Sequence, residues 1–286
     1  LPSFREASSL KDIPEFRQAA RRARALGLKI SVAVNAIRLN CRVPDAQRLA
    51  ALCAEAERYG ADAFIISNIS ALKIFADHGF KPEAALHLSS VQPCFNSAAA
   101  AFFIRLGFSR LILPNQLAPR EAGALLRLCR EKGVETEIFD YRFFGCAYIN
   151  GRCHLHLPEY YTLNSRVPDG SLCRVSTPIG KDLKLLNLAK GDANAALARS
   201  AARRLSSRLA CGGAPRMANA AAFFDFFTAG INYLKYGTRQ DPPAVKIQKV
   251  KQVRAMISLA EKLSADLGAE KAKDAFIERL TAWKGN

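Results

Sequence analysis

The feature that most constrains the fold is a repeated unit in which an amphipathic helix is followed by a short apolar strand. Helical periodicity covers residues 13–26 and gives way to a strand-like segment at 29–36. The same order recurs four more times along residues 45–141, at the spacing of roughly 25 residues that parallel βα units show. The expected strands are 63–68, 85–89, 110–114 and 135–141, and the helices before them are 45–60, 71–77, 97–106 and 119–132.

These strands are near-continuous apolar runs, which is typical of parallel strands covered on both faces. The pattern therefore predicts an α/β fold, either a parallel barrel or a doubly wound sheet. The rhythm breaks at 143–178, where an irregular, cysteine-bearing insertion is expected because long structureless loops are uncommon unless functional or tied down. Helical patterns resume at 181–209 and 218–229, followed by a last strand at 231–237 and two helices within 245–284.

Polar residues stand at or just past the ends of several expected strands: Asn35, Asn68, Ser89, Asn115 and Arg239. In barrel enzymes the carboxyl ends of the strands form the active site. The same residues also suit strand ends and helix caps, so the pattern leaves both interpretations open.

The chain has 286 residues, of which 50% are hydrophobic, enough for a large buried core. Its longest apolar runs, such as 98–104, are far shorter than the ~20 residues that a membrane-spanning helix needs. No signal-peptide pattern precedes the first helix, so we expect a cytoplasmic protein. The 42 Lys and Arg exceed the 25 Asp and Glu, for a net charge of +17, which makes RNA a candidate partner.

Eight cysteines in a cytoplasmic chain are expected to be reduced. Cys53 and Cys129 lie on the apolar stripes of expected helices, where a cysteine is usually a small core side chain. Cys41 and Cys94 stand alone in expected loops, and the sequence indicates no role for either.

The other four cysteines form a spaced set. Six residues separate Cys146 from Cys153, nineteen separate Cys153 from Cys173, and thirty-seven separate Cys173 from Cys211. Iron–sulfur clusters accept dispersed thiolates, whereas structural zinc sites usually present close pairs, which this chain lacks. Spacing alone leaves open a cluster, zinc, core packing and a thiol nucleophile with a nearby histidine.

A resemblance favours the cluster. Residues 137–153 read EIFDYRFFGCAYINGRC and resemble the signature of peptidase family U32, the collagenase-like peptidases. Similar stretches are Val34-Asn35, LHLSSVQPCF with Asn96-Ser97 after it, LILPNQLAPRE at 111–121, and AGINYLKYGTR at 229–239. The resemblance extends from about Phe16 to Lys262.

The resemblance implies a single TIM-type (β/α) barrel domain over 1–286 that carries the insertion 143–178. It also implies a [4Fe-4S] cluster on Cys146, Cys153, Cys173 and Cys211, as in family members of the ubiquinone U type. Such members hydroxylate ubiquinone precursors, or cytidine in RNA, without dioxygen. Prephenate is their proposed oxygen donor, and a partner protein of the same family is expected.

The alternatives are a collagenase-like peptidase, as the family name states, and an RNA-modifying or RNA-binding protein. For a small-molecule substrate, the candidate binding residues are Asn35, Asn96 and Arg239. The chain departs from the family pattern before its first cysteine, where Val-His-Gly is replaced by residues without histidine. It also has Pro114-Asn115-Gln116 in place of Pro-Arg-Glu, so no acid or base is assigned.

Family barrels begin with two strands for which this chain has no counterpart before residues 29–36. An open parallel sheet leaves unpaired edges, which compact proteins avoid. We therefore expect that further sequence precedes Leu1 or that a partner covers the gap.

Overall fold

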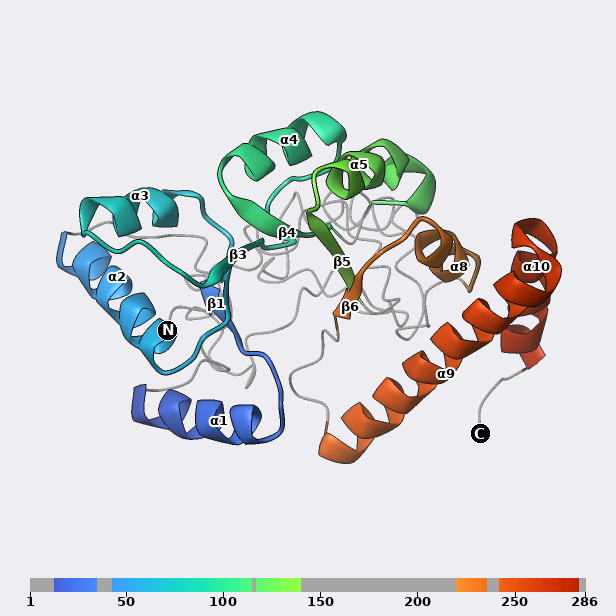
Figure 1. The fold of residues 1–286 in the computed structure, drawn as a ribbon, viewed down its shortest axis with the longest axis horizontal. Helices are drawn as coiled ribbons and strands as arrows, with labels where there is room; N and C mark the ends of the chain where they lie inside the picture. The colour runs from blue at the N-terminus through green and yellow to red at the C-terminus, as the bar shows by residue number, and fades with distance from the viewer. Residues whose placement is uncertain (1–12, 35–42, 115–116, 140–219, 236–241, 283–286) are drawn as a thin grey trace, which may run out of the picture.

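The computed structural model describes residues 13–34, 43–114, 117–139, 220–235 and 242–282. Within them, six strands form one sheet in the order β1-β2-β3-β4-β5-β6, and every neighbouring pair is parallel. The strands are β1 Ser31–Val34, β2 Ala63–Ile66, β3 Ala85–Leu88, β4 Phe108–Ile112, β5 Glu135–Phe139 and β6 Tyr233–Lys235. The sheet curls into a half-barrel (Figure 1), so the predicted α/β fold with parallel strands is confirmed.

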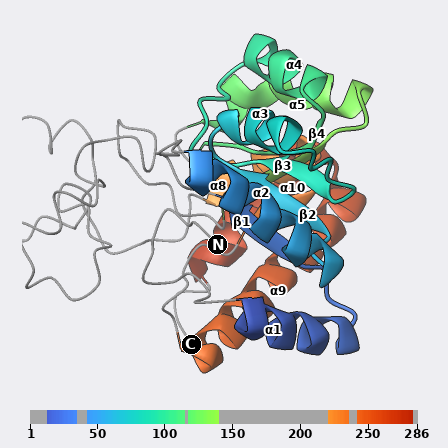
Figure 2. The ribbon, with the colours of Figure 1, turned by 90° about the vertical axis from the view of Figure 1, so that its left-hand side faces the viewer.

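Helices follow one another in an arc around the convex side of the sheet (Figures 1 and 2). The first five are α1 Ile13–Ala25, α2 Val43–Arg58, α3 Ser70–Asp77, α4 Ser97–Arg105 and α5 Pro119–Glu131. After β5 come α8 Ala220–Thr228, α9 Pro243–Leu267 and α10 Ala269–Ala282. These bounds agree with the predicted helices to within about two residues, because the apolar stripes and the glycines that follow them mark the ends. Gly27, for example, follows α1 with φ of 67°, a conformation that favours glycine.

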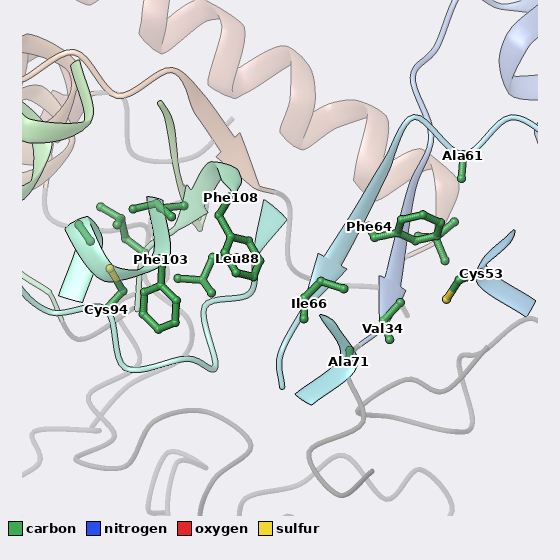
Figure 3. Close-up of a cluster of buried hydrophobic side chains, with 14 of the residues drawn as sticks. Val34, Cys53, Ala61, Phe64, Ile66, Ala71, Leu88, Cys94, Phe103 and Phe108 are labelled. Carbon is green, nitrogen blue, oxygen red and sulfur yellow. The ribbon is translucent and has the colours of Figure 1, made fainter. Parts of the chain in front are cut away.

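The main hydrophobic core lies between the sheet and its helices (Figure 3). Phe64 and Ile66 of β2 and Leu88 of β3 point toward the helices and are almost fully buried. Phe103 of α4 packs edge-on against Phe108 of β4, with 6.0 Å between the ring centroids. Alternate side chains of a strand face opposite sides of the sheet. Because these residues face the helices, their neighbours along each strand lie on the concave face.

A second hydrophobic cluster joins α8, α9 and α10. Phe223 stacks on Phe276 with 5.3 Å between ring centroids and 18° between the ring planes, and Met256 and Leu263 of α9 are buried beside them. Leu234 of β6 packs against both this cluster and the main core. The last helices are therefore attached to the sheet through β6.

The predicted β4 was wrong at its start, which lies at Phe108 rather than Arg110. The register between β3 and β4 shifts at this point, with Leu86 opposite Phe108 and His87 opposite Arg110. Ser109 is thus an extra, bulged residue that breaks the alternation of apolar and polar side chains. The break hides the start of the strand from a search for periodic patterns.

Among the residues that the structure describes, no helix has both the length and the apolar character to cross a bilayer. The predicted helix at 181–209 and the insertion 143–178 lie outside the described residues.

The adjacent residues Phe102 and Phe103 of α4 offer a matched test of the core. Phe103 is 6% exposed and Phe102 is 42% exposed. We expect Phe103→Ala to lower the free energy of unfolding by about 3–5 kcal/mol, because it leaves a cavity beside Phe108. Phe102→Ala should cost less than about 1.5 kcal/mol. Urea denaturation of both variants checks this, and equal losses would contradict the placement of α4.

Candidate functional site

Charged and polar side chains gather on the concave face of the sheet, opposite the helix-facing core. They come from four neighbouring strands: His87 on β3, Arg110 on β4, Glu135 and Glu137 on β5, and Tyr233 and Lys235 on β6. Strand register places His87 beside Arg110, Arg110 beside Glu135, and Glu137 beside Tyr233. Paired residues of neighbouring strands point to the same side of a sheet, so these six share one face. We call them the concave-face network.

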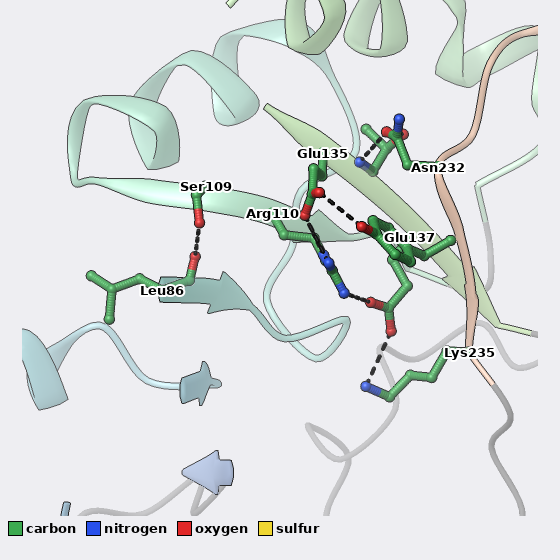
Figure 4. Close-up of polar contacts among 9 residues, drawn as sticks. Leu86, Ser109, Arg110, Glu135, Glu137, Asn232 and Lys235 are labelled. Atoms are coloured by element: carbon green, nitrogen blue, oxygen red, sulfur yellow. Dashed lines mark hydrogen bonds and ion pairs between the residues drawn. The ribbon is translucent and has the colours of Figure 1, made fainter. Parts of the chain in front are cut away.

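Arg110 is the centre of this network (Figure 4). Its Nη2 lies 2.7 Å from Glu135 Oε2, and its Nη1 lies 3.1 Å from Glu137 Oε2. Its guanidinium also stacks over the Tyr233 ring, 3.6 Å from the centroid. Lys235 Nζ approaches the other oxygen of Glu137 at 3.3 Å. One planar cation thereby links β4 to β5 and β6.

The bulge at Ser109 aims Arg110 into this face. Ser109 Oγ donates to the carbonyl oxygen of Leu86 at 3.3 Å, which fixes the extra residue against β3 (Figure 4). Phe108 and Leu111, on either side, both belong to the helix-facing core. In a strand with strict alternation, Phe108 and Leu111 would face opposite sides of the sheet. The extra residue allows both to face the helices while Arg110 points away from the helices.

The network costs free energy to bury. The side chain of Glu137 is 8% exposed and that of Arg110 is 15% exposed. Buried ion pairs often contribute less to stability than apolar residues of the same volume, and removing one partner leaves a costly unpaired charge. A contribution to folding stability is therefore a weak explanation for four charged groups inside a half-barrel. Clusters of this kind are candidates for functional sites.

Glu135 and Tyr233 are coupled at the edge of the network. The Tyr233 hydroxyl donates to Glu135 Oε1 at 2.9 Å. Burial raises the pKa of Glu135, but hydrogen bonds from Arg110 and Tyr233 outweigh it, so that pKa lies below its usual value. The hydrogen bond to Glu135 raises the pKa of Tyr233. At neutral pH the network therefore holds a carboxylate and a neutral phenol in contact.

His87 is the imidazole of the network, and it is held in its neutral form. It is only 5% exposed, and burial, with the nearby charge of Arg110, lowers its pKa to about 4. The imidazole is thus neutral at physiological pH. It makes no hydrogen bond or ion pair with the residues that the structure describes, so its ring nitrogens are not committed to a partner there.

Polar residues at the ends of β2 and β3 fix the backbone near the network. Gln92 donates a hydrogen bond to the carbonyl oxygen of Ser67, and Ser67 Oγ donates to that of Val34 at 3.4 Å. Asn68 Oδ1 accepts from the backbone N–H of Ser70 at the start of α3. Ser89 is buried beside them. Asn68 thus stabilises the turn just before α3, whose N-cap is Ile69.

Asn96, predicted to bind substrate, is the N-cap of α4. Its Oδ1 accepts a hydrogen bond from the backbone N–H of Ala99 at 2.9 Å, which explains locally why a helix begins at Ser97. A contact between Asn96 and substrate stays a prediction. The predicted residues Asn35 and Arg239 lie outside the described part of the chain, as do the four predicted iron ligands, Cys146, Cys153, Cys173 and Cys211.

Three cysteines are described, and all are buried core residues with free thiols. Burial raises the pKa of Cys53 and of Cys94 to about 12 and that of Cys129 to about 11. Thiols in this state are neither nucleophiles nor metal ligands. The packing roles predicted for Cys53 and Cys129 are confirmed. In the same described ranges, no group of three or more His, Cys, Asp or Glu side chains could hold a metal ion.

Sequence reasoning missed the concave-face network, because the strands were interpreted as continuous apolar runs. The signal was present in the alternation of charged and uncharged residues in Glu135-Thr136-Glu137, where Thr136 and Ile138 are the buried, helix-facing positions. A charge at every second position of a strand indicates one polar face. On β4 the bulge concealed the same signal.

The low pKa of His87 predicts a specific pH dependence of stability. As pH falls from 6.5 to about 4, the unfolded chain takes up a proton on this imidazole and the folded chain does not. The free energy of unfolding should therefore decrease by about 3 kcal/mol across that window through His87 alone. Between pH 7 and pH 4, His87→Gln should therefore lose about 3 kcal/mol less stability than wild type, as measured by denaturant titration. The exposed His78→Gln is the control, and parallel curves for wild type and His87→Gln would contradict the buried, neutral state.

Comparison with known proteins places the chain in a family. A solved structure titled "The Structure of the U32 Peptidase Mk0906" is similar at 15% identity with a TM-score of 0.37, covering 48% of this chain and 55% of that chain. The chain thus aligns with little more than half the length of that structure. No curated protein matched the sequence. The model of peptidase family U32 matches residues 3–169, a range that includes Cys146 and Cys153 and ends before Cys173. Because that range is more than half of the 286 residues, the chain belongs to peptidase family U32.

Proposed function

We propose that this chain is an enzyme whose reaction takes place over the concave face of the half-barrel. We further propose that it carries a [4Fe-4S] cluster on Cys146, Cys153, Cys173 and Cys211, and that it hydroxylates an aromatic or heteroaromatic small molecule without dioxygen. The observation that carries the proposal is the concave-face network around Arg110.

The network supports a reaction site because its groups have distinct protonation states and are held in place. Arg110 is fixed by two carboxylates and an aromatic ring. His87 is neutral and can accept a proton, and Tyr233 is protonated and can donate one. Pairs of titratable groups whose environments separate their pKa values are the usual arrangement for acid and base catalysis.

The cysteine count supports the ligand assignment. Of the eight cysteines, Cys53, Cys94 and Cys129 are buried and protonated. Apart from Cys41, that leaves the four at the spacing of the U type, and four thiolates are the usual donor set of a [4Fe-4S] cluster. When bound, such a cluster supplies one-electron transfer. The free thiols also suit a reducing, cytoplasmic compartment.

Substrate and oxygen donor would bind along the rim of the half-barrel. Asn35, Asn96 and Arg239 are the proposed contacts, and a guanidinium such as that of Arg239 suits a carboxylate bidentately. Prephenate is the proposed oxygen donor, and a second protein of the same family is the proposed partner. The net charge of +17 keeps RNA, with cytidine as the hydroxylated base, as an alternative substrate.

Peptide hydrolysis is the second candidate function. It rests on the family to which the chain belongs and on His87, since a neutral imidazole near carboxylates can activate water. None of the three described thiols suits the nucleophile, because their pKa values are raised to about 11 or 12. This reading therefore needs water, or a thiol outside the described residues, as the attacking group.

Iron and sulfide analysis after anaerobic purification separates the two functions. We expect about four iron and four sulfide per chain. Serine at any one of Cys146, Cys153, Cys173 or Cys211 should lower both contents at least severalfold, because each thiolate is a ligand. Cys129→Ala, in the core, is the control and should keep the full content.

Two results would contradict the cluster. One is a colourless, iron-free protein whose fourfold serine variant keeps full activity. The other is hydrolysis of peptides by metal-free protein that is abolished by changing a single cysteine. The second result would establish the peptidase alternative.

A further inference from the structure

A separate cavity of about 620 Å³ lies between α8, β6 and α9, on the helix-facing side of the sheet. Its lining includes Ile138, Ile231 and Leu234, together with Phe226 of α8 and Val253 of α9. The cavity lies at the junction of the two hydrophobic clusters, because Leu234 belongs to the surroundings of both. Its volume is in the range of small-molecule sites.

Side chains from the first half of α9 do not fill the cavity. The buried residues of this helix, Met256, Ala260 and Leu263, all lie in its second half, where it packs on α10 and α8. In the first half, Val250 is a wall of the cavity and is 45% exposed, and Ile247, one turn earlier, is 57% exposed. Apolar side chains thus continue along α9 beyond the part that packs.

Two of the polar groups in the lining are already occupied. Asn232 Oδ1 accepts hydrogen bonds from the backbone N–H and the hydroxyl of Thr136, at 2.8 and 3.1 Å. The Tyr233 hydroxyl donates to Glu135. The remaining two, Arg254 and Glu261, stand on α9 and form no ion pair or hydrogen bond with the described residues. These two are the charged groups of the lining that a ligand could engage.

The first half of α9, up to Arg254, is basic, and Glu261 adds a negative charge further along the helix. Residues 243–254 carry Lys246, Lys249, Lys251 and Arg254 and contain no Asp or Glu. Glu261 follows Arg254 by seven residues, about 10 Å along a helix. Arg254 is the basic residue of α9 that lines the cavity, so this end of the apolar cavity carries a positive charge, and the negative group lies two turns away. An anion is favoured at the Arg254 end, with its apolar part lying in the cavity.

We propose that this cavity binds an amphipathic monocarboxylate, with the carboxylate paired to Arg254 and the apolar body among the Phe, Ile, Leu and Val side chains. A guanidinium matches a carboxylate through two parallel hydrogen bonds. The site is distinct from the concave-face network, and it does not rest on the function proposed above. Tyr233 is among the residues that line the cavity, and its hydroxyl belongs to that network, so the two sites meet at this residue of β6.

Isothermal titration calorimetry of the full chain with dodecanoate and with dodecanol tests the proposal. Both should bind at one site, and dodecanoate should bind more tightly. Arg254→Gln should weaken dodecanoate about tenfold and leave dodecanol unchanged, because the guanidinium is lost and the apolar walls remain. Lys251→Gln removes a neighbouring exposed charge that does not line the cavity, and it should change dodecanoate binding less than about twofold.

A second experiment fills the cavity with a larger side chain. Val253→Phe should weaken both ligands at least tenfold, with the folded state of the variant checked by circular dichroism; if Val253→Phe does not fold, Ile257→Phe takes its place. Three results would overturn the proposal: no saturable binding of dodecanoate by wild type, equal effects of Arg254→Gln and Lys251→Gln, or binding that persists when the cavity is filled.

Discussion

The pairing of Arg110 with Glu135 and Glu137 is the interaction on which the arrangement of the concave face depends. A guanidinium is planar and has five donors in a fixed fork, so it can engage two carboxylates of one strand and still stack on the ring of Tyr233. The contact crosses three strands, β4, β5 and β6. On the helix-facing side of the same strands, Leu111 and Ile138 belong to the core and Leu234 packs against it.

The rest of the half-barrel follows from that division of faces. Helices α2 to α5 pack on the convex side through a continuous apolar core, and β6 connects this core to α8, α9 and α10 through Leu234. The same separation places the concave-face network and the cavity beside α9 on opposite sides of β6. A barrel-type sheet can hold a polar site on one side because the other side supplies the hydrophobic stabilisation.

Much of the fold could be predicted from the sequence, because helical and strand periods and terminal glycines are local signals. The start of β4 could not, since the bulge at Ser109 depends on pairing with β3. The concave-face network was also missed, because its members are up to about 150 residues apart in sequence, from His87 to Lys235, and strand order alone brings them together. The roles of Cys53 and Cys129 were predictable, since each lies on the apolar stripe of a helix. The proposed cysteine ligands rest on spacing and resemblance.

We propose that this member of peptidase family U32 performs a hydroxylation over its polar concave face. The most direct measurement compares hydroxylated quinone precursors and modified nucleosides, by mass spectrometry, in cells lacking the protein and in the same cells supplied with variants. We predict that one hydroxylated compound is lost and that wild type and Phe102→Ala restore it. Glu137→Gln, present at equal level and folded, should restore less than about a tenth. Loss of no hydroxylated compound, or full restoration by Glu137→Gln, would contradict it.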